Sequence, residues 1–343
     1  MNWSEVSHLL CVRLDSIGDV LMTTPAVRAC KETFGCRITL LTSAAGAAVA
    51  KLVPEIDACI EFGAPWMKAT SPRTDEEMIQ RLGEERFDAA VIFTVYSQNP
   101  LPAAYLCYLA RIPLRLGYCR ENPYQLLTHW QPDPEPGSVV RHEVQRQLDL
   151  VAAVGARATH TRLSFAVPAG AGESVARLLQ DMNRPLVVVH PGATAASRRY
   201  PPEHFARAVD MLIDETGCDA IFTGDAGEDG LVRSVLAQMS NPAHSLVGKL
   251  SLAELGALIG AADVLICNNT GPAHVAAALG TPVVDLYALT NPQHTPWQVR
   301  SRVLYHDVPC RNCYKSVCPA GHHDCLRRVT PETVTAAARE MLL

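Results

Sequence analysis

The stretch DVLICNNTGPAHVAAALGTPVVDLYA, residues 263–288, decides the fold of this chain. An apolar run at 263–269 ends in polar residues, a helix of small residues is expected at 271–280, and a second apolar run follows at 282–288. Two strands joined through a helix require a crossover, and such crossovers build a parallel sheet. The stretch therefore predicts a strand–helix–strand unit of an α/β domain.

The same alternation extends outward over the whole chain. Residues 129–140 hold four prolines or glycines and are expected to form a loop. We expect two doubly wound parallel-sheet domains, residues 1–170 and 171–343, facing each other across a cleft. Apolar runs predict the other strands at 8–14, 37–43, 59–63, 88–96, 114–118, 185–193, 219–225 and 244–248, with helices between most of them and a last helix at 331–342.

The composition is that of a globular protein and argues against a nucleic-acid-binding module. Hydrophobic residues make up 48% of the chain, charged residues 19%, and the formal net charge is −5. A basic stripe for nucleic-acid phosphates is therefore not expected. The first sixteen residues lack a basic start, and Arg13 and Asp15 interrupt their apolar run. We expect neither a signal peptide nor a spanning helix, and hence a cytoplasmic protein.

Ligands of open parallel sheets bind at the carboxyl ends of the strands, so the loops after the strands carry the chemistry. In the opening stretch, Asn269 or Thr270 is expected to cap a helix, and Gly271 lets backbone approach a ligand closely. The first-turn amides of that helix lack partners and carry partial positive charge. A diphosphate is the expected occupant, with His274 as a further donor.

Two other loops of the second domain suit a nucleotide. Arg198, after the strand at 185–193, can bring a fixed positive charge to a diphosphate, although a solvated loop arginine is equally consistent. Asp225 and Glu228 can accept hydrogen bonds from ribose hydroxyls or a base amine. Their alternative role is to cap a helix.

The first domain offers one candidate for acid–base chemistry, the sequence SIGD at 16–19. Asp19 follows Gly18 at a strand-to-helix turn, where an acid is either an N-terminal cap or a general base. Because this turn is expected across the cleft from the nucleotide loops, we interpret Asp19 as the base.

The twelve cysteines form two groups. Eight lie singly in apolar segments and are expected to be buried small hydrophobes. The other four are clustered, which predicts a structural site for Zn²⁺ or Fe, with His322 or His323 able to replace one thiol. Two disulfides or free thiols are the alternative. The clustered residues are Cys310, Cys313, Cys318 and Cys325, and we expect this segment to staple an irregular loop.

Four motifs in this order resemble those of the bacterial heptosyltransferases, glycosyltransferase family 9. The resemblance runs from about Leu9 to Leu342. The motifs are VRLDSIGDVLMTTPAV (12–27), VVVHPGA with RRYPPEHFA (187–206), NNTGPAHVAAALGTPVV (268–284) and LTNP (289–292).

The resemblance implies a GT-B fold, with an N-terminal domain for the acceptor and a C-terminal domain for an ADP-heptose donor. It implies that Asp19 deprotonates the acceptor hydroxyl for a single inverting displacement. No cofactor is required for catalysis, because the helix start and Arg198 can stabilise the departing diphosphate. The donor residues expected on these motifs are Gly18, Thr194, Arg198, Glu228, Asn269, Thr270, Gly271 and His274.

One position departs from the family pattern. Many members have Asp where this chain has Asn269. An amide also caps a helix but brings no charge, which leaves the sugar of the donor open.

The acceptor is expected to be a saccharide, such as the lipopolysaccharide core, or a lipid-linked sugar. Ser97 and Asn99, in the loop at 94–105, are the expected acceptor contacts. The basic and partly apolar residues 110–120 leave peripheral contact with the inner face of the inner membrane open. Two other functions fit the same sequence: a non-hydrolysing sugar-nucleotide epimerase and an inactive metal-knuckle binding protein.

Overall fold

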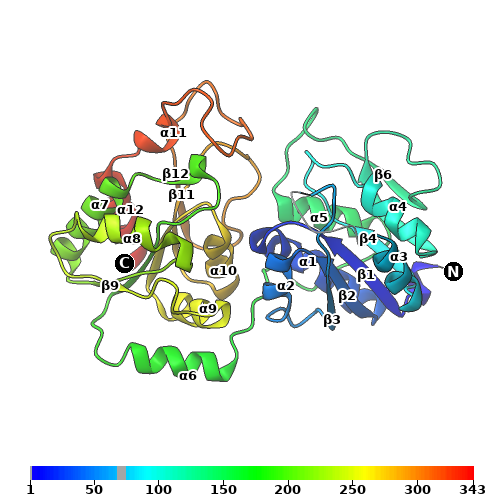
Figure 1. The fold of residues 1–343 in the computed structure, drawn as a ribbon, viewed down its shortest axis with the longest axis horizontal. Coiled ribbons are helices and arrows are strands. Elements are labelled where there is room, and N and C mark those ends of the chain that lie inside the picture. Colours follow the sequence, from blue (N-terminus) through cyan, green and yellow to red (C-terminus); the bar gives the residue numbers. More distant parts are fainter. Residues whose placement is uncertain (1, 68–74) are drawn as a thin grey trace. The chain divides into compact units, whose positions relative to one another are not determined.

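The computed structural model describes residues 2–67 and 75–343, and the chain divides into two compact units, Met1–Ala166 and Val167–Leu343. Each unit is built around one six-stranded sheet whose paired strands run parallel. Helices cover the faces of each sheet (Figure 1). The expected α/β class is confirmed.

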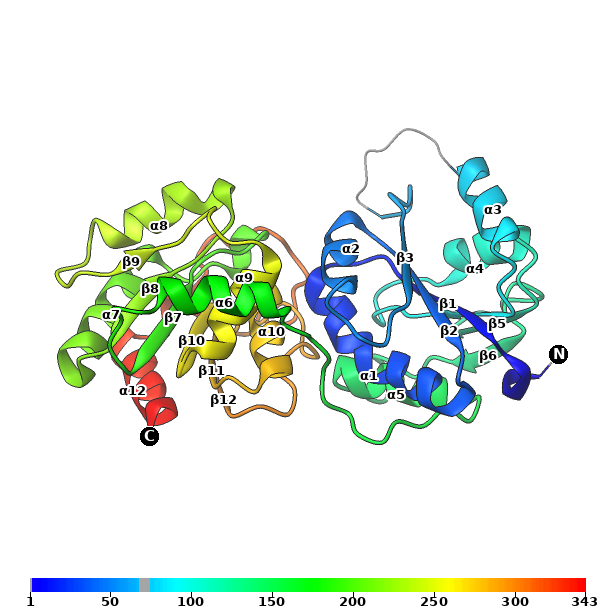
Figure 2. The ribbon, with the colours of Figure 1, turned by 90° about the horizontal axis from the view of Figure 1, so that it is seen from below.

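The sheet of the first unit has the strand order β3-β2-β1-β4-β5-β6. Helix α1 packs against α2 and α5, and α3 packs against α4. Figure 2 shows α1 with α5 on one side of this sheet and α3 with α4 on the other. The strands are β1 (His8–Arg13), β2 (Arg37–Thr42), β3 (Ala58–Glu61), β4 (Ala89–Ile92), β5 (Leu114–Cys119) and β6 (His129–Pro132); the helices are α1 (Ile17–Phe34), α2 (Ala44–Ala50), α3 (Asp75–Glu84), α4 (Leu101–Leu109) and α5 (Glu143–Ala152).

The sheet of the second unit has the order β12-β11-β10-β7-β8-β9. Helix α9 packs against α6 and α10, and α7 packs against α8 and α12. The strands are β7 (Leu186–His190), β8 (Asp219–Phe222), β9 (His244–Ser245), β10 (Val264–Asn268), β11 (Val283–Leu286) and β12 (Ser301–Leu304); the helices are α6 (Ala169–Leu178), α7 (Pro202–Thr216), α8 (Asp229–Leu236), α9 (Leu252–Ala261), α10 (Gly271–Leu279), α11 (Asp324–Arg327) and α12 (Pro331–Leu342).

Two elements differ from the sequence expectation. The prediction of a loop over 129–140 was wrong at its start, where β6 forms an edge strand beside β5. Pro132 ends this strand, and proline is tolerated at a sheet edge because its missing N–H interrupts no inner ladder. Strand β4 ends at Ile92 rather than at residue 96, so the polar residues that follow lie in a loop.

The cores explain the continuous apolar runs. Strands β4, β7 and β11 are buried at every position, as expected for parallel strands covered by helices on both faces. Helices α1 and α10 end at Gly35 and Gly280, whose φ angles of 62° and 81° favour glycine. Seven of the eight single cysteines are buried and Cys59 is half-buried, which confirms their role as small core residues.

Close packing between α2 and β2 generates a test of the fold. A Cβ atom at Gly46 would lie 1.9 Å from Oγ1 of Thr42, which is a fully buried β-branched residue. We expect Gly46→Ala to lower the free energy of unfolding by about 1–3 kcal/mol in thermal or denaturant melts. Gly170→Ala is the control, because α6 leaves open space there. Equal stability of the two variants would contradict this packing.

Candidate active site

The first unit gathers charged side chains at the carboxyl end of β1. Arg13, the last residue of β1, is fully buried and contacts three carboxylates. Its Nε lies 3.0 Å from Asp15, its Nη2 3.0 Å from Asp19 and its Nη1 2.8 Å from Glu143. Burial alone would lower the pKa of Arg13, but these acids together raise it above its ordinary value. One guanidinium therefore holds three acids that come from the β1–α1 turn and α5.

Asp19 is the third residue of α1, and Ser16 is the N-cap. Its Oδ2 accepts hydrogen bonds from the Ser16 amide at 3.1 Å and the Ser16 hydroxyl at 2.6 Å, while Oδ1 accepts from Arg13. The carboxylate thus closes a capping box and is held in one orientation. Its side chain keeps 16% of its surface exposed, so the capping role does not bury it.

Of the two other acids around Arg13, Glu143 is fully buried, whereas the Asp15 side chain, 13% exposed, is nearly as exposed as that of Asp19. Burial raises the pKa of Asp15 to about 6, although Arg13 lowers it. Burial also raises the pKa of Glu143, which is fully buried and accepts a hydrogen bond from Gln147 at 2.6 Å. Asp19 is the acid of this cluster whose carboxylate is fixed both by Arg13 and by the N-terminal cap of α1.

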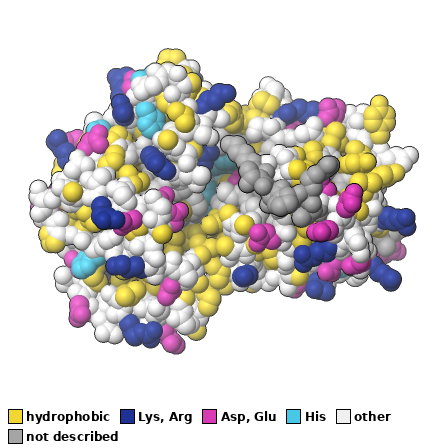
Figure 3. Space-filling model, in the orientation of Figure 1, with side chains coloured by type: hydrophobic (Ala, Val, Ile, Leu, Met, Phe, Trp, Pro, Cys, Tyr) yellow, Lys and Arg dark blue, Asp and Glu magenta, His cyan; other side chains and the backbone are white. Residues whose placement is uncertain are grey.

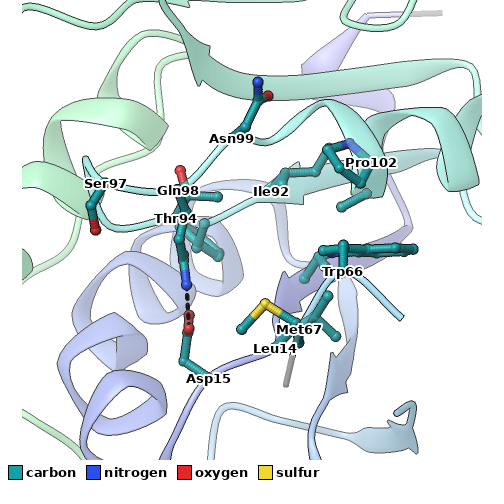
Figure 4. A pocket seen from close by; sticks show the side chains of 13 residues that line it. Leu14, Asp15, Trp66, Met67, Ile92, Thr94, Ser97, Gln98, Asn99 and Pro102 are labelled. Carbon is teal, nitrogen blue, oxygen red and sulfur yellow. Dashed lines mark hydrogen bonds between the residues drawn. The ribbon is translucent and has the colours of Figure 1, made fainter. Parts of the chain in front are cut away.

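A cavity of about 360 Å³ opens beside this cluster, at the carboxyl ends of β1 and β4 (Figure 4). Asp15 lines it and accepts a hydrogen bond from Gln98 at 2.5 Å. Ser97 and Asn99, the expected acceptor residues, also line it. The Asn99 amide is bonded to Glu121 at 2.8 Å, and its Oδ1 accepts from the Leu101 amide at the start of α4. Both polar ends of the Asn99 side chain are thus bonded within the first unit, and its role as an acceptor contact stays a prediction.

In the second unit, the expected phosphate-binding turn joins β10 to α10. Thr270 is the N-cap, but its hydroxyl bonds back to the Asn268 carbonyl at 3.2 Å and makes no cap bond. Gly271 is half-buried at the start of the helix, and His274 is buried one turn in. Pro272 has no N–H and the Ala273 amide donates to the Thr270 carbonyl at 3.1 Å, so Gly271 supplies the first-turn amide that the cap side chain leaves for a ligand.

His190 and Glu228 meet at the carboxyl ends of β7 and β8. The His190 Nε2 atom lies 3.7 Å from Glu228, and burial lowers the pKa of His190 to about 4. Glu228 pairs with Asp225 in a capping box, the alternative role expected for these acids. A Cβ atom at Gly192 would lie 1.9 Å from the Glu228 carboxylate. Only a residue without a side chain lets Glu228 lie against this loop.

Arg198 lies in the loop after β7, where η2 (Ala196–Arg198) forms one turn. Asn291, oriented to suit its neighbours, donates to the Thr290 carbonyl at 3.1 Å and accepts from the Arg198 Nη2 at 2.9 Å. The Tyr287 hydroxyl donates to the Asn291 carbonyl at 2.5 Å and accepts from the His294 amide at 3.1 Å. Tyr287 thereby fixes the loop that holds the guanidinium.

Asp285 is the acidic residue beneath this loop. It is fully buried on β11, and neither carboxylate oxygen has a hydrogen-bond partner within residues 2–67 and 75–343. Burial raises its pKa well above the ordinary value, while the positive charge of Arg198 lowers it. Arg198 therefore bonds to the Asn291 amide and lies close enough to Asp285 to oppose the effect of burial on that acid.

The cysteine-rich segment 310–325 docks on the same two loops. Ser197 donates from its amide to the Ser316 carbonyl at 3.0 Å and from its hydroxyl to the Lys315 carbonyl at 2.6 Å. The Asn312 amide donates to the Leu289 carbonyl at 2.6 Å, and His323 Nε2 contacts the Ser197 carbonyl at 2.6 Å. These contacts are consistent with the expected staple, since the segment braces both sides of Arg198.

The four clustered thiols suit Zn²⁺ or Fe by donor type, but their arrangement does not. Among the described residues, no three His, Cys, Asp or Glu side chains come together as a metal site. Cys310 Sγ lies 3.8 Å from His322 Nε2, and His323 is bonded to backbone. The metal at Cys310, Cys313, Cys318 and Cys325 stays a prediction, which elemental analysis of the purified protein checks.

The expected donor residues fall in both units. Gly18 is buried in the first turn of α1, in the first unit, whereas the remaining expected donor residues belong to the second unit. Thr194 is exposed in the loop after β7. Residues Arg13, Asp15, Glu143, Asp285 and Tyr287 were not expected in the sites, although a charged residue within or directly after an apolar strand is a signal that could have identified Arg13, Asp15 and Asp285.

Comparison with known proteins identifies the family. The model of Glycosyltransferase family 9 (heptosyltransferase) matches residues 76–323. The chain belongs to glycosyltransferase family 9. It is therefore a glycosyltransferase, and its Asp19 motif precedes the matched range.

This family 9 enzyme is 28% identical over 277 residues to Lipopolysaccharide heptosyltransferase 2 of Escherichia coli (strain K12), covering 76% of this chain and 77% of that one. The structure of Escherichia coli ADP-heptose lipopolysaccharide heptosyltransferase II matches with a TM-score of 0.76 and 23% identity over 98% of both chains. An Escherichia coli heptosyltransferase with ADP-2-deoxy-2-fluoro heptose gives a TM-score of 0.69 and 19% identity, covering 97% of this chain and 99% of that one. The expected GT-B fold is confirmed.

Two surface properties of this glycosyltransferase complete the description. Within the described residues, each helix is too short or too polar to cross a bilayer. Basic and acidic side chains are interspersed over the face drawn in Figure 3, in keeping with the near balance of 30 basic and 35 acidic residues.

The raised pKa of Asp15 predicts a pH-dependent stability. The folded state binds this proton more tightly than the unfolded state, whose pKa is near the ordinary 3.8. The stabilisation is present in full below about pH 4 and is lost as pH rises through about 6. Asp15→Asn removes this loss.

We expect the free energy of unfolding of Asp15→Asn, relative to that of the native protein, to increase between pH 4 and pH 7 by an amount on the order of a few kcal/mol. Thermal melts at a series of pH values measure this change. Asp149→Asn is the control, because Asp149 lies on α5 of the same unit and forms a half-exposed ion pair with Arg141, which precedes that helix. A difference between Asp15→Asn and the native protein that stays constant over this pH range would contradict the assignment.

Proposed function

We propose that this enzyme transfers a heptose from ADP-heptose to a saccharide acceptor of the lipopolysaccharide core, with inversion at the anomeric carbon. One observation carries the proposal: Asp19 is fixed between Arg13 and Ser16 at the carboxyl end of β1, with part of its side chain still exposed. A carboxylate fixed in this way suits a general base, because its orientation is set before substrate binds. The donor is inferred from the relative solved with an ADP-heptose analogue.

In the proposed reaction, Asp19 accepts the proton of the acceptor hydroxyl. The acceptor oxygen forms a bond to the anomeric carbon as the bond from that carbon to the diphosphate oxygen breaks. The negative charge that develops on the departing ADP is stabilised by the Gly271 amide and the partial positive charge at the start of α10, and by Arg198. A single displacement of this kind inverts the anomeric configuration.

The second unit supplies the donor contacts in this proposal. Arg198 and the start of α10 bind the diphosphate. Glu228 and His190 lie at the carboxyl ends of β8 and β7, the edge of a parallel sheet at which nucleosides bind. Asn269 is buried beside the diphosphate turn and brings no charge to it. An uncharged residue at this position repels a doubly charged diphosphate less than the Asp carboxylate of many relatives would.

The acceptor is bound by the first unit, in the cavity beside Asp15. We place the enzyme in the cytoplasm, at the inner face of the inner membrane, where a lipid-linked acceptor is exposed. Tyr105, Tyr108 and Leu109 are exposed on α4, and Arg111 follows them. Tyrosines beside arginine suit the interface between water and lipid headgroups.

Replacing the base tests the reaction. We expect Asp19→Asn to lower kcat by about 10²–10⁴-fold, since the amide cannot accept the proton, while ADP affinity is kept. Transfer is measured by mass spectrometry with ADP-heptose and a truncated core acceptor, and donor alone is the check for epimerisation.

Glu254→Gln is the matched control, because Glu254 closes the same kind of capping box on Ser251 at the start of α9. Both variants lose a cap, but only Asp19→Asn is expected to lose transfer. A kcat of Asp19→Asn within threefold of the native value would refute the role of Asp19.

Tyr287 tests whether the loop at 289–294 holds Arg198 for the diphosphate. We expect Tyr287→Phe to weaken ADP binding by about 5–20-fold, as expected for one buried hydrogen-bond network worth roughly 1–2 kcal/mol. In an Arg198→Ala background the same change should have little effect, which a double-mutant cycle by calorimetry measures.

Thr335→Val is the control for this cycle, since the buried Thr335 hydroxyl on α12 donates to the Ala208 carbonyl on α7 at 3.0 Å, and both residues lie outside the loops around Arg198. Equal losses of ADP affinity in Tyr287→Phe with and without Arg198 would show that Tyr287 acts independently of the guanidinium.

A further inference from the structure

We propose that Asp285 couples nucleotide binding to a proton: the second unit binds the diphosphate of ADP when the Asp285 carboxyl is protonated, and binds it more weakly when that carboxyl is ionised. This inference rests on the proposed function, in which the diphosphate contacts Arg198 and the start of α10, and it adds a pH-sensitive control of that site.

Asp285 lies inside the second sheet, close to the turn that leads into α10. In the parallel register of β10 and β11 it stands opposite Cys267, three residues before the N-cap Thr270. Val284 and Leu286 belong to the core on the side of α7 and α12, so the alternation of a strand turns Asp285 to the other face, on which α10 packs. The spacing of strands and residues puts its carboxyl on the order of 10 Å from the turn.

The surroundings of Asp285 favour the neutral acid. The residue is fully buried, and neither carboxylate oxygen accepts a hydrogen bond from a described residue. A carboxylate without water or a donor is costly to keep ionised, whereas a protonated carboxyl carries no charge and needs far less solvation. Burial accordingly raises the pKa of Asp285 well above its ordinary value.

Arg198 is the cation that acts on this acid, and it lowers the pKa of Asp285 against the larger effect of burial. On β12, the residue paired with Asp285 is the apolar Val303. The other titratable side chains on the elements around it are Cys267 on β10, His274 on α10, and Tyr287 and His294 after β11. The charged side chains of α12, on the other face of β11, are paired at the surface: Glu332 with Arg207, Arg339 with Glu215 and Glu340 with Arg302.

An ionised Asp285 opposes a diphosphate in two ways. It repels the phosphate charges: over on the order of 10 Å, at an effective dielectric constant of about 20, Coulomb's law makes this roughly a tenfold loss of affinity per unit of phosphate charge. It also competes with the diphosphate for Arg198, the cation that acts on both groups. The protonated acid does neither, because it is uncharged.

The coupling is reciprocal. If protonation of Asp285 strengthens ADP binding, bound ADP must raise the pKa of Asp285 by the same free energy. ADP binding above the pKa of the free protein therefore takes up a proton. The sign follows: ADP affinity is full while Asp285 is protonated and falls as pH rises through that pKa.

Direct binding of ADP as a function of pH tests the inference. Titration calorimetry on the full chain between pH 7 and pH 9.5 keeps the terminal phosphate of ADP largely ionised throughout. We expect the dissociation constant of ADP to rise at least tenfold over this range. Asp285→Asn, which mimics the neutral acid, should bind ADP within threefold of the native protein at pH 7 and change by less than threefold up to pH 9.5.

Two controls separate this effect from a general response to pH. Asp219→Asn makes the same change at the amino end of β8 in the same sheet, where Asp219 accepts from the Asn183 amide at 2.6 Å, and it should keep the native pH dependence. Adenosine lacks the diphosphate, so its affinity for the native protein should change by less than threefold. Titrations in buffers of different ionisation enthalpy at pH 9 should show proton uptake with ADP and not with adenosine.

A native ADP affinity that stays constant over this pH range overturns the inference, as does an unchanged pH dependence in Asp285→Asn. Both results leave the proposed function intact, since ADP still binds. Absence of ADP binding at every pH contradicts the proposed function itself. Should Asp285→Asn fail to fold, the native protein decides: proton uptake with ADP alone supports the inference, and equal uptake with ADP and adenosine overturns it.

Discussion

The first unit depends on one buried guanidinium. Arg13 is fully buried at the end of an inner strand, and water cannot reach it. A cation in that position requires compensating acids, and Asp15, Asp19 and Glu143 supply them from two separate parts of the chain. The same ion pair that compensates the buried charge of Arg13 therefore also orients Asp19. Removing Arg13 would leave three buried or half-buried carboxylates without their shared cation.

The second unit achieves the same rigidity with neutral hydrogen bonds. Tyr287 bonds to the loop that holds Arg198, and the cysteine-rich segment bonds to the backbone around Ser197. Arg198 itself remains half-buried. The two units therefore fix their charged groups in different ways: one by surrounding a cation with acids, the other by bracing the loop that carries it.

Sequence periodicity predicted the α/β class and most strands, because buried parallel strands are continuous apolar runs. It could not predict β6, a short edge strand that ends in a proline and in which half-buried and exposed residues alternate. For the candidate sites, motifs predicted roles for Asp19, Arg198 and the turn before α10, since these residues follow predictable strand ends, and these roles stay predictions. Tyr287 was not predicted, because an aromatic residue in an apolar segment looks like core until its neighbours in space are known. The pairing of Arg13 with Glu143 joins residues 130 positions apart, and no local pattern indicates it.

The docking of the cysteine-rich segment has a consequence for biosynthesis. All strands of the first sheet lie between residues 8 and 132, so that unit can form while the ribosome is still translating the second. The loops that carry Arg198 and Asn291 gain their brace only when residues 310–325 have left the exit tunnel. A nascent chain would therefore form the acid cluster of its first unit before the loops around Arg198 are braced to bind a nucleotide. A chain truncated before residue 310 would have a folded first unit and an unbraced second unit.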